Sequence, residues 1–455
     1  MLDFLRDRIQ LLVIILAWVF ATVFAGPLIY ALLPITVFLF YRRESFPDML
    51  FGFIFILVLS DMTPEIFQMR KIKTAKYAYI IALSVILLAD QWRFQPMAAV
   101  FKLFLPFFVY SFFPLIFGND PITGVQKTIS YALLYLVVPN YVLLNFRRHG
   151  WDFFKNLMYF LVALLLASQL MRLGPNWWAF AGGRFRGFFG NPNGLGIFTF
   201  LVFMLFVIIN SLKRDLLPFR TKMLFYAIVG GFLIACGSRT SLTATLMFLL
   251  FSRFFSLSPF IGVIMFIVFL GVVEAVSSNL TAIVFALGLQ NYMRVETLED
   301  GSGRYIAWAF AWGKIQDYFM FGGGFGNDEF IMRQNYAYLR TLGHHGGVHN
   351  SYLTMWFNVG IIGLLIFFRS FFLIFIKASK RVPMALATMF AVMFSVLYES
   401  WLSGSLNPFT IMLVIILTLV TEPEIVEWEE RQQQAAEEEP GAVAEPQWQP
   451  LPPGH

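Results

Sequence analysis

The segment GLGIFTFLVFMLFVIINS, residues 194–211, decides the fold class of this chain. It contains no charged side chain, and a helix of that length crosses most of the hydrocarbon core of a bilayer. The whole chain has the same character, because its 455 residues are 58% hydrophobic and only 13% charged, with a mean hydropathy of +0.70. Soluble domains carry about 25% charged residues. We therefore expect a polytopic membrane protein.

Apolar segments of similar character recur along the chain up to residue 421. Segment 49–60 is short and segment 27–41 is marginal, so we expect about twelve to fourteen transmembrane helices. Backbone groups in lipid must be hydrogen-bonded internally, and these segments lack the alternation of barrel strands, so the predicted fold is all-α. The candidate spans are 9–25, 27–41, 49–60, 76–90, 97–117, 124–145, 152–171, 194–211, 222–237, 240–256, 257–276, 352–376, 383–400 and 405–421.

Basic residues in the short connections predict the orientation, because cytoplasmic loops are enriched in Lys and Arg. Most basic clusters fall on one side of the predicted spans, which we expect to be cytoplasmic. These clusters are Arg6 with Arg8, Arg42-Arg43, Arg147-Arg148, Lys213 to Lys222, Arg253, and Lys377 to Arg381. A further group, Arg70, Lys71, Lys73 and Lys76, falls on the opposite side. The topology of 49–75 therefore stays open.

Two segments differ from the rest of the chain. Residues 277–350 form a long polar interruption within the membrane domain, residues 1–421, and we expect a periplasmic loop that contains short amphipathic helices. Residues 422–455 hold nine Glu and one Arg, a composition typical of disordered segments that have no core. We expect this second domain to be a disordered, acidic, cytoplasmic tail.

Histidines and arginines gather on the predicted outer face. Three of the five histidines lie between positions 344 and 349, and histidine can take and give protons near neutral pH. This cluster predicts a reaction site at the membrane boundary. Arg184, Arg186, Arg239 and Arg304 also lie on this face, where the orientation rule disfavours them. The guanidinium fork matches phosphate oxygens, so these arginines predict an anionic ligand.

Two segments of the long loop can be interpreted from their patterns. Gly322 to Gly326 lacks the strand–loop–helix context and the Lys-Ser/Thr ending of a nucleotide-binding loop. We expect flexible backbone there, and no nucleotide or nucleic acid partner. Segment 303–316 has apolar residues at spacings of three and four, which predicts an amphipathic helix on the bilayer surface. Trp308 on this helix is either an interfacial aromatic or a platform for sugar rings.

Acidic residues of the loop do not predict a metal site. Asp328, Glu329, Asp300 and Glu299 are available as ligands, but they show no recognisable ligand spacing. We therefore expect neither a catalytic metal nor another cofactor.

Several short polar motifs follow one another along the second half of the chain. The motifs are Phe188 to Gly196 (FFGNPNGLG), Gly237 to Thr240 (GSRT), Gly303-Arg304 with Trp308, Gly322 to Gly326, and His349-Asn350. Together they resemble those of the O-antigen ligase and polymerase superfamily, which comprises bacterial inner-membrane glycosyltransferases of the GT-C type, and the resemblance covers roughly residues 180–365. His349-Asn350 is followed by nine residues and then Gly360-Ile361-Ile362-Gly363, which is similar to the ligase signature, although Leu364 stands where Ser or Thr is usual.

The resemblance implies a specific reaction on the periplasmic side of the bacterial inner membrane. A ligase moves a finished glycan from undecaprenyl pyrophosphate to a hydroxyl of the lipid A–core acceptor, without a nucleotide sugar or a metal. His349 would be the general base, with His345 as the alternative base, and Arg304 and Arg239 would clamp the pyrophosphate. Asn350 would orient the base or a phosphate. The remaining residues of the expected substrate-binding surface are Arg184, Arg186, Asn191, Asn193 and Trp308.

Other functions stay open at this stage. A polymerase would use the same lipid-linked donor but a growing glycan as the acceptor. A transporter or flippase for lipid-linked sugars predicts charges along a path through the bundle, often in matching halves, and no internal repeat is evident. A protein O-oligosaccharyltransferase would usually carry a larger outer domain after the spans. Membrane lipids are the expected surroundings in every case, and the oligomeric state is not predicted.

Overall fold

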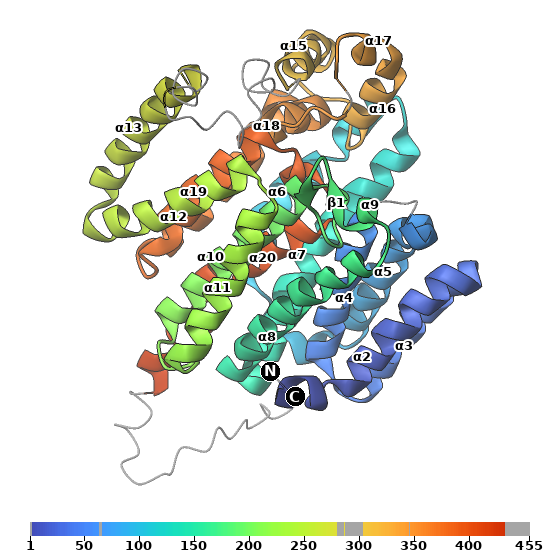
Figure 1. The fold of residues 1–455 in the computed structure, drawn as a ribbon, viewed down its shortest axis with the longest axis vertical. Coiled ribbons are helices and arrows are strands. Elements are labelled where there is room, and N and C mark those ends of the chain that lie inside the picture. Colours follow the sequence, from blue (N-terminus) through green and yellow to red (C-terminus); the bar gives the residue numbers. More distant parts are fainter. Residues whose placement is uncertain (1, 63–65, 280–285, 287–303, 345, 433–455) are drawn as a thin grey trace, which may run out of the picture.

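The computed structural model of the protein describes residues 2–62, 66–279, 286, 304–344 and 346–432. Within this part the chain is a bundle of helices with one short hairpin, in which β1 (Phe180–Ala181) pairs antiparallel with β2 (Arg184–Phe185). The predicted all-α class is confirmed, and Figure 1 shows many of the helices side by side, inclined to the long axis of the molecule.

Each of the fourteen predicted apolar segments forms a helix. The first begins as an α-helix, continues through a π-helical turn, Ala21–Ala25, and ends at Gly26–Leu28. The helices are α2 (Ile9–Phe20), α3 (Ile29–Arg42), α4 (Phe46–Asp61), α5 (Ile72–Ala89), α6 (Ala99–Tyr110), α7 (Pro121–His149), α8 (Trp151–Ala167), α10 (Pro192–Leu212), α11 (Phe219–Ala235), α12 (Arg239–Leu257), α13 (Pro259–Ser278), α18 (Ser351–Ala378), α19 (Met384–Tyr398) and α20 (Pro408–Thr421).

The number of candidate spans is smaller than the number of apolar helices. Seven helical segments of the described chain are long and apolar enough to cross a membrane, and three shorter apolar helices accompany them. The expected count of twelve to fourteen differs for two reasons. Two predicted spans join into one segment, Ile9–Arg42, and others are short, such as α20 with 14 residues. The protein is a multi-pass membrane protein.

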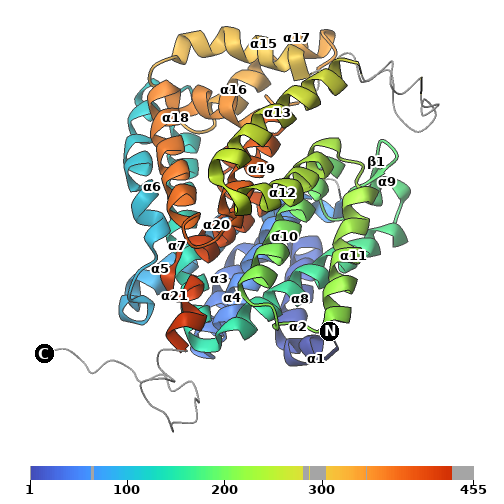
Figure 2. The ribbon, with the colours of Figure 1, turned by 90° about the vertical axis from the view of Figure 1, so that its left-hand side faces the viewer.

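One end of the bundle, which we call the tail end, carries α1 (Leu2–Asp7) and α21 (Pro423–Val426), as Figure 2 shows. Basic residues predicted to share one side meet acids there. Arg8 pairs with Asp48 at 2.9 Å, and Glu44 accepts from both Arg93 and Arg148. These two hydrogen bonds lower the pKa of the Glu44 carboxyl. The predicted clustering of basic residues at one end therefore has a structural counterpart in cross-helix ion pairs.

The expected disordered tail does not begin at residue 422. Helix α21 covers Pro423–Val426 and helical residues continue to 432, while 433–455 lie outside the described residues. Two contacts order this stretch: Ile425 is buried, and Glu424 accepts two hydrogen bonds of 2.6 Å from Arg147. Acidic composition suggested disorder, but here the acids meet basic helix ends.

The opposite end, which we call the cap end, is covered by α15 (Arg304–Ile315), α16 (Asn327–Gln334) and α17 (Tyr336–Thr341), seen at the top of Figures 1 and 2. Helix α15 is the predicted amphipathic helix. Its residues Ala307, Ala311 and Ile315 are spaced by four and fully buried in a small apolar core with Phe357 of α18. Packing on α18 therefore takes up the apolar face that was expected to meet the bilayer surface.

The glycine run docks onto a break in α18. Gly360 has φ +66°, and a Cβ there would lie 2.3 Å from the Met320 carbonyl oxygen, so only glycine fits. The backbone N–H groups of Gly323 and Gly324 donate to the carbonyls of Phe357 and Asn358 just before the break. The glycines thus let the loop approach α18 closely.

Arg147→Ala is expected to lower the thermal unfolding temperature. Arg147 also donates to the carbonyl oxygens of Phe94, Gln95 and Pro96, so truncation leaves several buried acceptors unpaired. Loss of a buried ion-pair partner costs roughly 3–5 kcal/mol. Because the Glu424 side chain is 26% exposed, we expect about 3 kcal/mol, the lower limit.

Arg431→Ala is the matched control, because it removes an exposed pair with Glu427 and should change stability by less than about 1 kcal/mol. Tryptophan fluorescence during heating in detergent would compare the two variants. Equal unfolding temperatures would contradict a stabilising role for the Arg147–Glu424 pair.

Candidate functional site

The carboxylate of Glu399 lies at the centre of the polar site at the cap end. The residue directly follows α19 and is 8% exposed. Its Oε1 accepts from Arg304 Nη2 at 2.7 Å and from Asn193 Nδ2 at 2.9 Å, while its Oε2 lies 3.6 Å from Nδ1 of His349. The last separation is an electrostatic contact rather than a hydrogen bond. Four distant parts of the sequence thus meet at one carboxylate.

Helix caps place two of these residues. Asn191 accepts from the Gly194 N–H at 2.8 Å and begins α10, and Asn350 accepts from the Leu353 N–H at 3.1 Å and begins α18. Both asparagines were expected to bind substrate, and Asn350 to orient the base. Their side-chain oxygens instead cap helices, which fixes the backbone next to Asn193 and His349.

His349 has an unusual backbone. Its φ is +52°, a left-handed conformation that non-glycine residues rarely adopt and that is common at functional sites. Gly346 lies against the ring, because a Cβ there would be 2.7 Å from His349 Nε2. The loop therefore holds the imidazole between Gly346 and Glu399, with 38% of its side chain exposed.

The other two histidines of the cluster differ from His349. His344 is buried, its Nε2 lies 3.1 Å from the Gly347 carbonyl oxygen, and its ring meets His349 edge-on at 5.9 Å. It supports the loop that carries His349. His345, the alternative base, lies outside the described residues.

Arg239 and Arg304 form the cationic part of the site. Arg239 is the first residue of α12 and is exposed, and within the described residues its side chain has no hydrogen bond or ion pair. It is close enough to Arg304 for their charges to repel each other. Helix N-termini attract anions, so Arg239 combines a free guanidinium with a favourable helix end.

The arginines of the preceding loop have different roles. Arg184 donates from Nη1 to Asn193 Oδ1 at 3.1 Å and to the Gly237 carbonyl at 3.3 Å, so it links Asn193 to the start of α12. Arg186, expected to bind substrate, is buried and donates to the carbonyls of Trp177, Trp178 and Gly190. Its donors hold the loop together because the loop has little secondary structure of its own.

Trp308 lies beside this cationic region. Its ring packs edge-on to Tyr305, with centroids 5.6 Å apart, and lies 6.2 Å from Tyr398. The Arg304 guanidinium lies over the same Tyr398 ring at 5.9 Å. The buried indole N–H has no hydrogen-bond partner among the described residues.

Sequence reasoning missed Glu399 and the lysines of α5. Glu399 could have been noticed as a lone acid between two apolar segments, because ionisable residues at membrane depth usually have a function. Lys73 and Lys76 appeared only as a conflict in the predicted topology. They lie at the cap end, where they line a cavity of about 500 Å³. A basic cluster on the unfavourable side was therefore a signal of a site.

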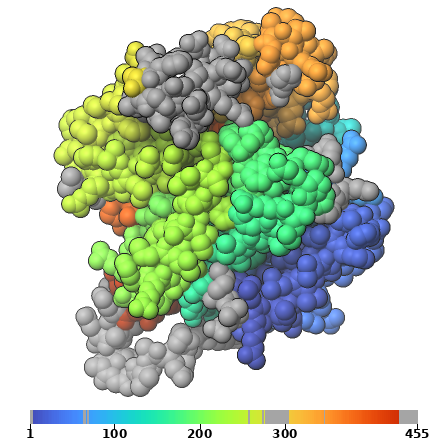
Figure 3. Space-filling model, viewed as in Figure 1, coloured from blue at the N-terminus to red at the C-terminus, as the bar shows by residue number. Residues whose placement is uncertain are grey.

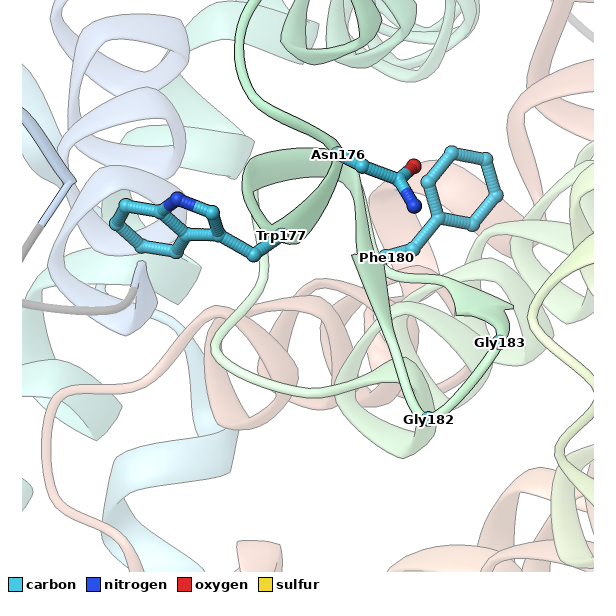
Figure 4. Close-up of a pocket in the computed structure, with 5 residues that line it drawn as sticks. All are labelled: Asn176, Trp177, Phe180, Gly182 and Gly183. Atoms are coloured by element: carbon cyan, nitrogen blue, oxygen red, sulfur yellow. The ribbon is translucent and has the colours of Figure 1, made fainter.

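A second cavity, of about 650 Å³, opens on the loop before α10. Figure 4 shows the Asn176 amide beside the Phe180 ring, with Trp177 pointing the other way and Gly182 and Gly183 at the hairpin turn. The green loop lies on the surface beneath the cap helices in Figure 3. The residues that line this cavity are Asn176, Trp177, Phe180, Gly182 and Gly183, and Glu399 is not among them.

Two acidic side chains, Glu329 and Asp328, line the lysine-containing cavity. Glu329 accepts from Lys127 at 2.6 Å, and burial, together with the charge of Glu329, raises the pKa of Asp328 to about 6. Among the described residues no group of three His, Cys, Asp or Glu side chains could hold a metal. Glu299 and Asp300 lie outside the described residues.

The fold and site define a multi-pass membrane protein with a histidine, arginines and a carboxylate gathered at one end of its bundle. Residues 224–368 match the family model described as O-antigen ligase, and this match supports the O-antigen ligase superfamily for the chain. The match spans Arg239, Arg304 and His349, whereas Asn193 and Glu399 lie outside it. No curated protein matches the chain significantly.

The family supports activity of the O-antigen ligase or polymerase type, which is a glycosyltransferase-like activity. It also implies a lipid-linked glycan substrate and a glycan acceptor within a membrane. The resemblance found in the sequence is thereby confirmed at the level of the superfamily.

Gly346→Ala is expected to lower the rate of glycan transfer about 10- to 100-fold, because its Cβ would displace the His349 ring and a misplaced reacting group is costly. The thermal unfolding temperature should change little, since the loop is at the surface of the bundle. Gly313→Ala in α15 is the control, because nothing lies within 4 Å of its Cβ position. Unchanged transfer by the Gly346 variant would contradict the placement of the ring.

Proposed function

We propose that the protein is a metal-independent glycosyltransferase that moves a glycan from undecaprenyl pyrophosphate to a hydroxyl of a lipid A–core acceptor. The reaction would take place on the periplasmic side of the bacterial inner membrane, at the cap end. The observation that carries the proposal is the meeting of His349 and Arg304 at Glu399, with Arg239 nearby.

His349 is the general base in this proposal. Its Nδ1 faces Glu399, so the carboxylate favours the tautomer with a proton on Nδ1 and leaves Nε2 as the acceptor of a proton. The acceptor oxygen forms its bond to the anomeric carbon of the donor sugar while its proton moves to Nε2. Contacts of catalytic groups are often long before substrate binds and shorten in the reacting complex, which fits the 3.6 Å separation.

Arg239 and Arg304 stabilise the leaving group. The bond between the anomeric carbon and the pyrophosphate oxygen breaks, and the lipid pyrophosphate keeps the electron pair and gains negative charge. Guanidinium groups already placed at that position stabilise the charge without reorganisation. Arg239 has no protein partner in the described chain, whereas Arg304 has donors left beside its bond to Glu399. In this proposal Arg239 binds the pyrophosphate alone, whereas Arg304 both binds it and connects it, through Glu399, to His349.

Ligase and polymerase share this chemistry and differ in the acceptor. The ligase is favoured by His349-Asn350 and by the spacing to Gly360-x-x-Gly363. Helix α18 begins directly after these two residues, and its break lies at Gly360. Deletion of the gene, followed by gel analysis of the surface glycan, distinguishes the two. Long polymer stranded on the lipid carrier indicates a ligase, and single repeat units attached to the core indicate a polymerase.

His349→Ala should reduce glycan transfer about 100-fold or more, because a positioned base contributes that much to proton transfer. The assay follows movement of glycan from a lipid-linked donor to purified acceptor. The variant should unfold at the wild-type temperature and still bind an undecaprenyl pyrophosphate analogue. Normal transfer by this variant would remove His349 as the base.

Arg239→Lys and Arg304→Lys should each weaken binding of the undecaprenyl pyrophosphate analogue about tenfold, because lysine lacks the bidentate fork. Calorimetric titration in detergent measures the affinities. Arg333→Lys in α16 is the control, since that arginine is exposed and the described structure has no hydrogen bond or ion pair between it and Glu399. Wild-type affinity in both test variants would refute the clamp.

A further inference from the structure

The cavity of about 500 Å³ at the cap end adjoins the proposed reaction centre. Its wall includes Gly347 and Val348, which lead into His349, and Ser400, which follows Glu399. Cavities of about 300–1,000 Å³ are typical of small-ligand sites. The residues lining the cavity do not include Arg239 or Arg304. It is therefore a separate space next to the same His349–Glu399 pair.

The wall of this cavity is unusually polar for a site in a membrane protein. Apolar side chains are few, namely Phe325, Val348 and Leu406, whereas most small-molecule pockets are lined mainly by apolar groups. Side chains with hydroxyl or amide groups dominate, and each can both donate and accept hydrogen bonds. They include Ser60, Tyr77, Thr354, Asn358, Ser403 and Asn407. Such a wall suits the many hydroxyl groups of a sugar.

Three lysines and two acids, Asp328 and Glu329, are the charged residues of the cavity wall. Lys127 is paired with Glu329 at 2.6 Å. Lys76 donates to the Leu406 carbonyl at 2.7 Å and to Ser60 Oγ at 3.4 Å, and neither acceptor is charged. Within the described part of the chain, no ion pair joins Lys73 or Lys76 to a carboxylate.

Among the described acids, Asp61 attracts both ammonium groups without forming an ion pair with either, and its Oδ2 accepts the Gly190 N–H at 3.1 Å. A partly buried cation that forms no ion pair is unfavourable, so an anion in the cavity would further stabilise Lys73 and Lys76. The chemistry required is a negative group attached to something rich in hydroxyls.

We propose that this cavity binds an anionic sugar residue of the acceptor, with its negative group on Lys73 and Lys76 and its hydroxyls on the Ser, Thr and Asn wall. The inference rests on the proposed function, in which Arg239 and Arg304 bind the pyrophosphate of the donor. Glu399 Oε1 faces Arg304 and Asn193, and Oε2 faces His349. The base thus lies between an arginine site for the donor and a lysine site for the acceptor.

Binding of simple sugars to the full-length protein in lipid nanodiscs tests the inference without any transfer. Glucose 1-phosphate, glucuronate, inorganic phosphate and neutral methyl glucoside are titrated by calorimetry. At least one anionic sugar should bind more tightly than the glucoside and than inorganic phosphate, and the tighter one identifies a phosphate or a carboxylate as the preferred group. Lys73→Gln should weaken that binding about tenfold or more, and Lys73→Arg should largely restore it.

Arg70→Gln is the matched control, because it removes an exposed charge from the neighbouring η3 (Ile66–Lys71) and should leave binding unchanged. Lys76→Met, which keeps a long apolar stem, is the second variant if Lys73→Gln unfolds. His349→Ala should bind the anionic sugar like wild type, so loss of the proposed base and loss of this site are distinguished. The inference is overturned if no anionic sugar binds, if the glucoside or inorganic phosphate binds as tightly, or if the lysine variants bind normally.

Discussion

A single carboxylate, that of Glu399, joins helices that are far apart in the sequence at the cap end of the bundle. It accepts from Arg304 at the start of α15 and from Asn193 at the start of α10, and it faces His349 before α18. A mostly buried carboxylate is unfavourable unless it is paired and hydrogen-bonded. The need to satisfy this charge therefore draws the cationic residue and the proposed base to the same place.

Backbone geometry keeps that arrangement rigid. Asn191 and Asn350 cap the N-termini of α10 and α18, next to Asn193 and His349. Arg186 donates hydrogen bonds within the loop before α10. Gly360 breaks α18 so that the glycine run can pack against it. Asn191, Asn350 and Arg186, which the sequence suggested as ligand contacts, thus fix the backbone next to Asn193 and His349.

The sequence was a good guide to helices and a partial guide to the site. Apolar segments become helices because lipid leaves the backbone no other partner, and all fourteen were found. His349, Arg239 and Arg304 could be selected because ionisable side chains are rare in such a chain. Glu399 was not selected, since only the packing of α19 against the cap end brings it to them.

Two other differences have local physical causes. The acidic segment after α20 was read as disordered, but its first acids pair with basic helix ends, as Glu424 does with Arg147. Lys73 and Lys76 contradicted the orientation rule because a polar cavity, and not the membrane boundary alone, sets their surroundings. The distribution of Lys and Arg predicts topology well only where these residues do not also line a binding site.

The most direct test of the role of Glu399 is a double-mutant cycle on thermal unfolding with Arg304→Gln and Glu399→Gln, in the full-length protein. Each single change leaves the partner's charge partly buried and unpaired, and the double change removes both charges. We predict that the double variant loses clearly less stability than the sum of the two single losses, by about 1–3 kcal/mol. Losses that simply add would contradict the account, because they would mean that Glu399 does not hold Arg304 at the site.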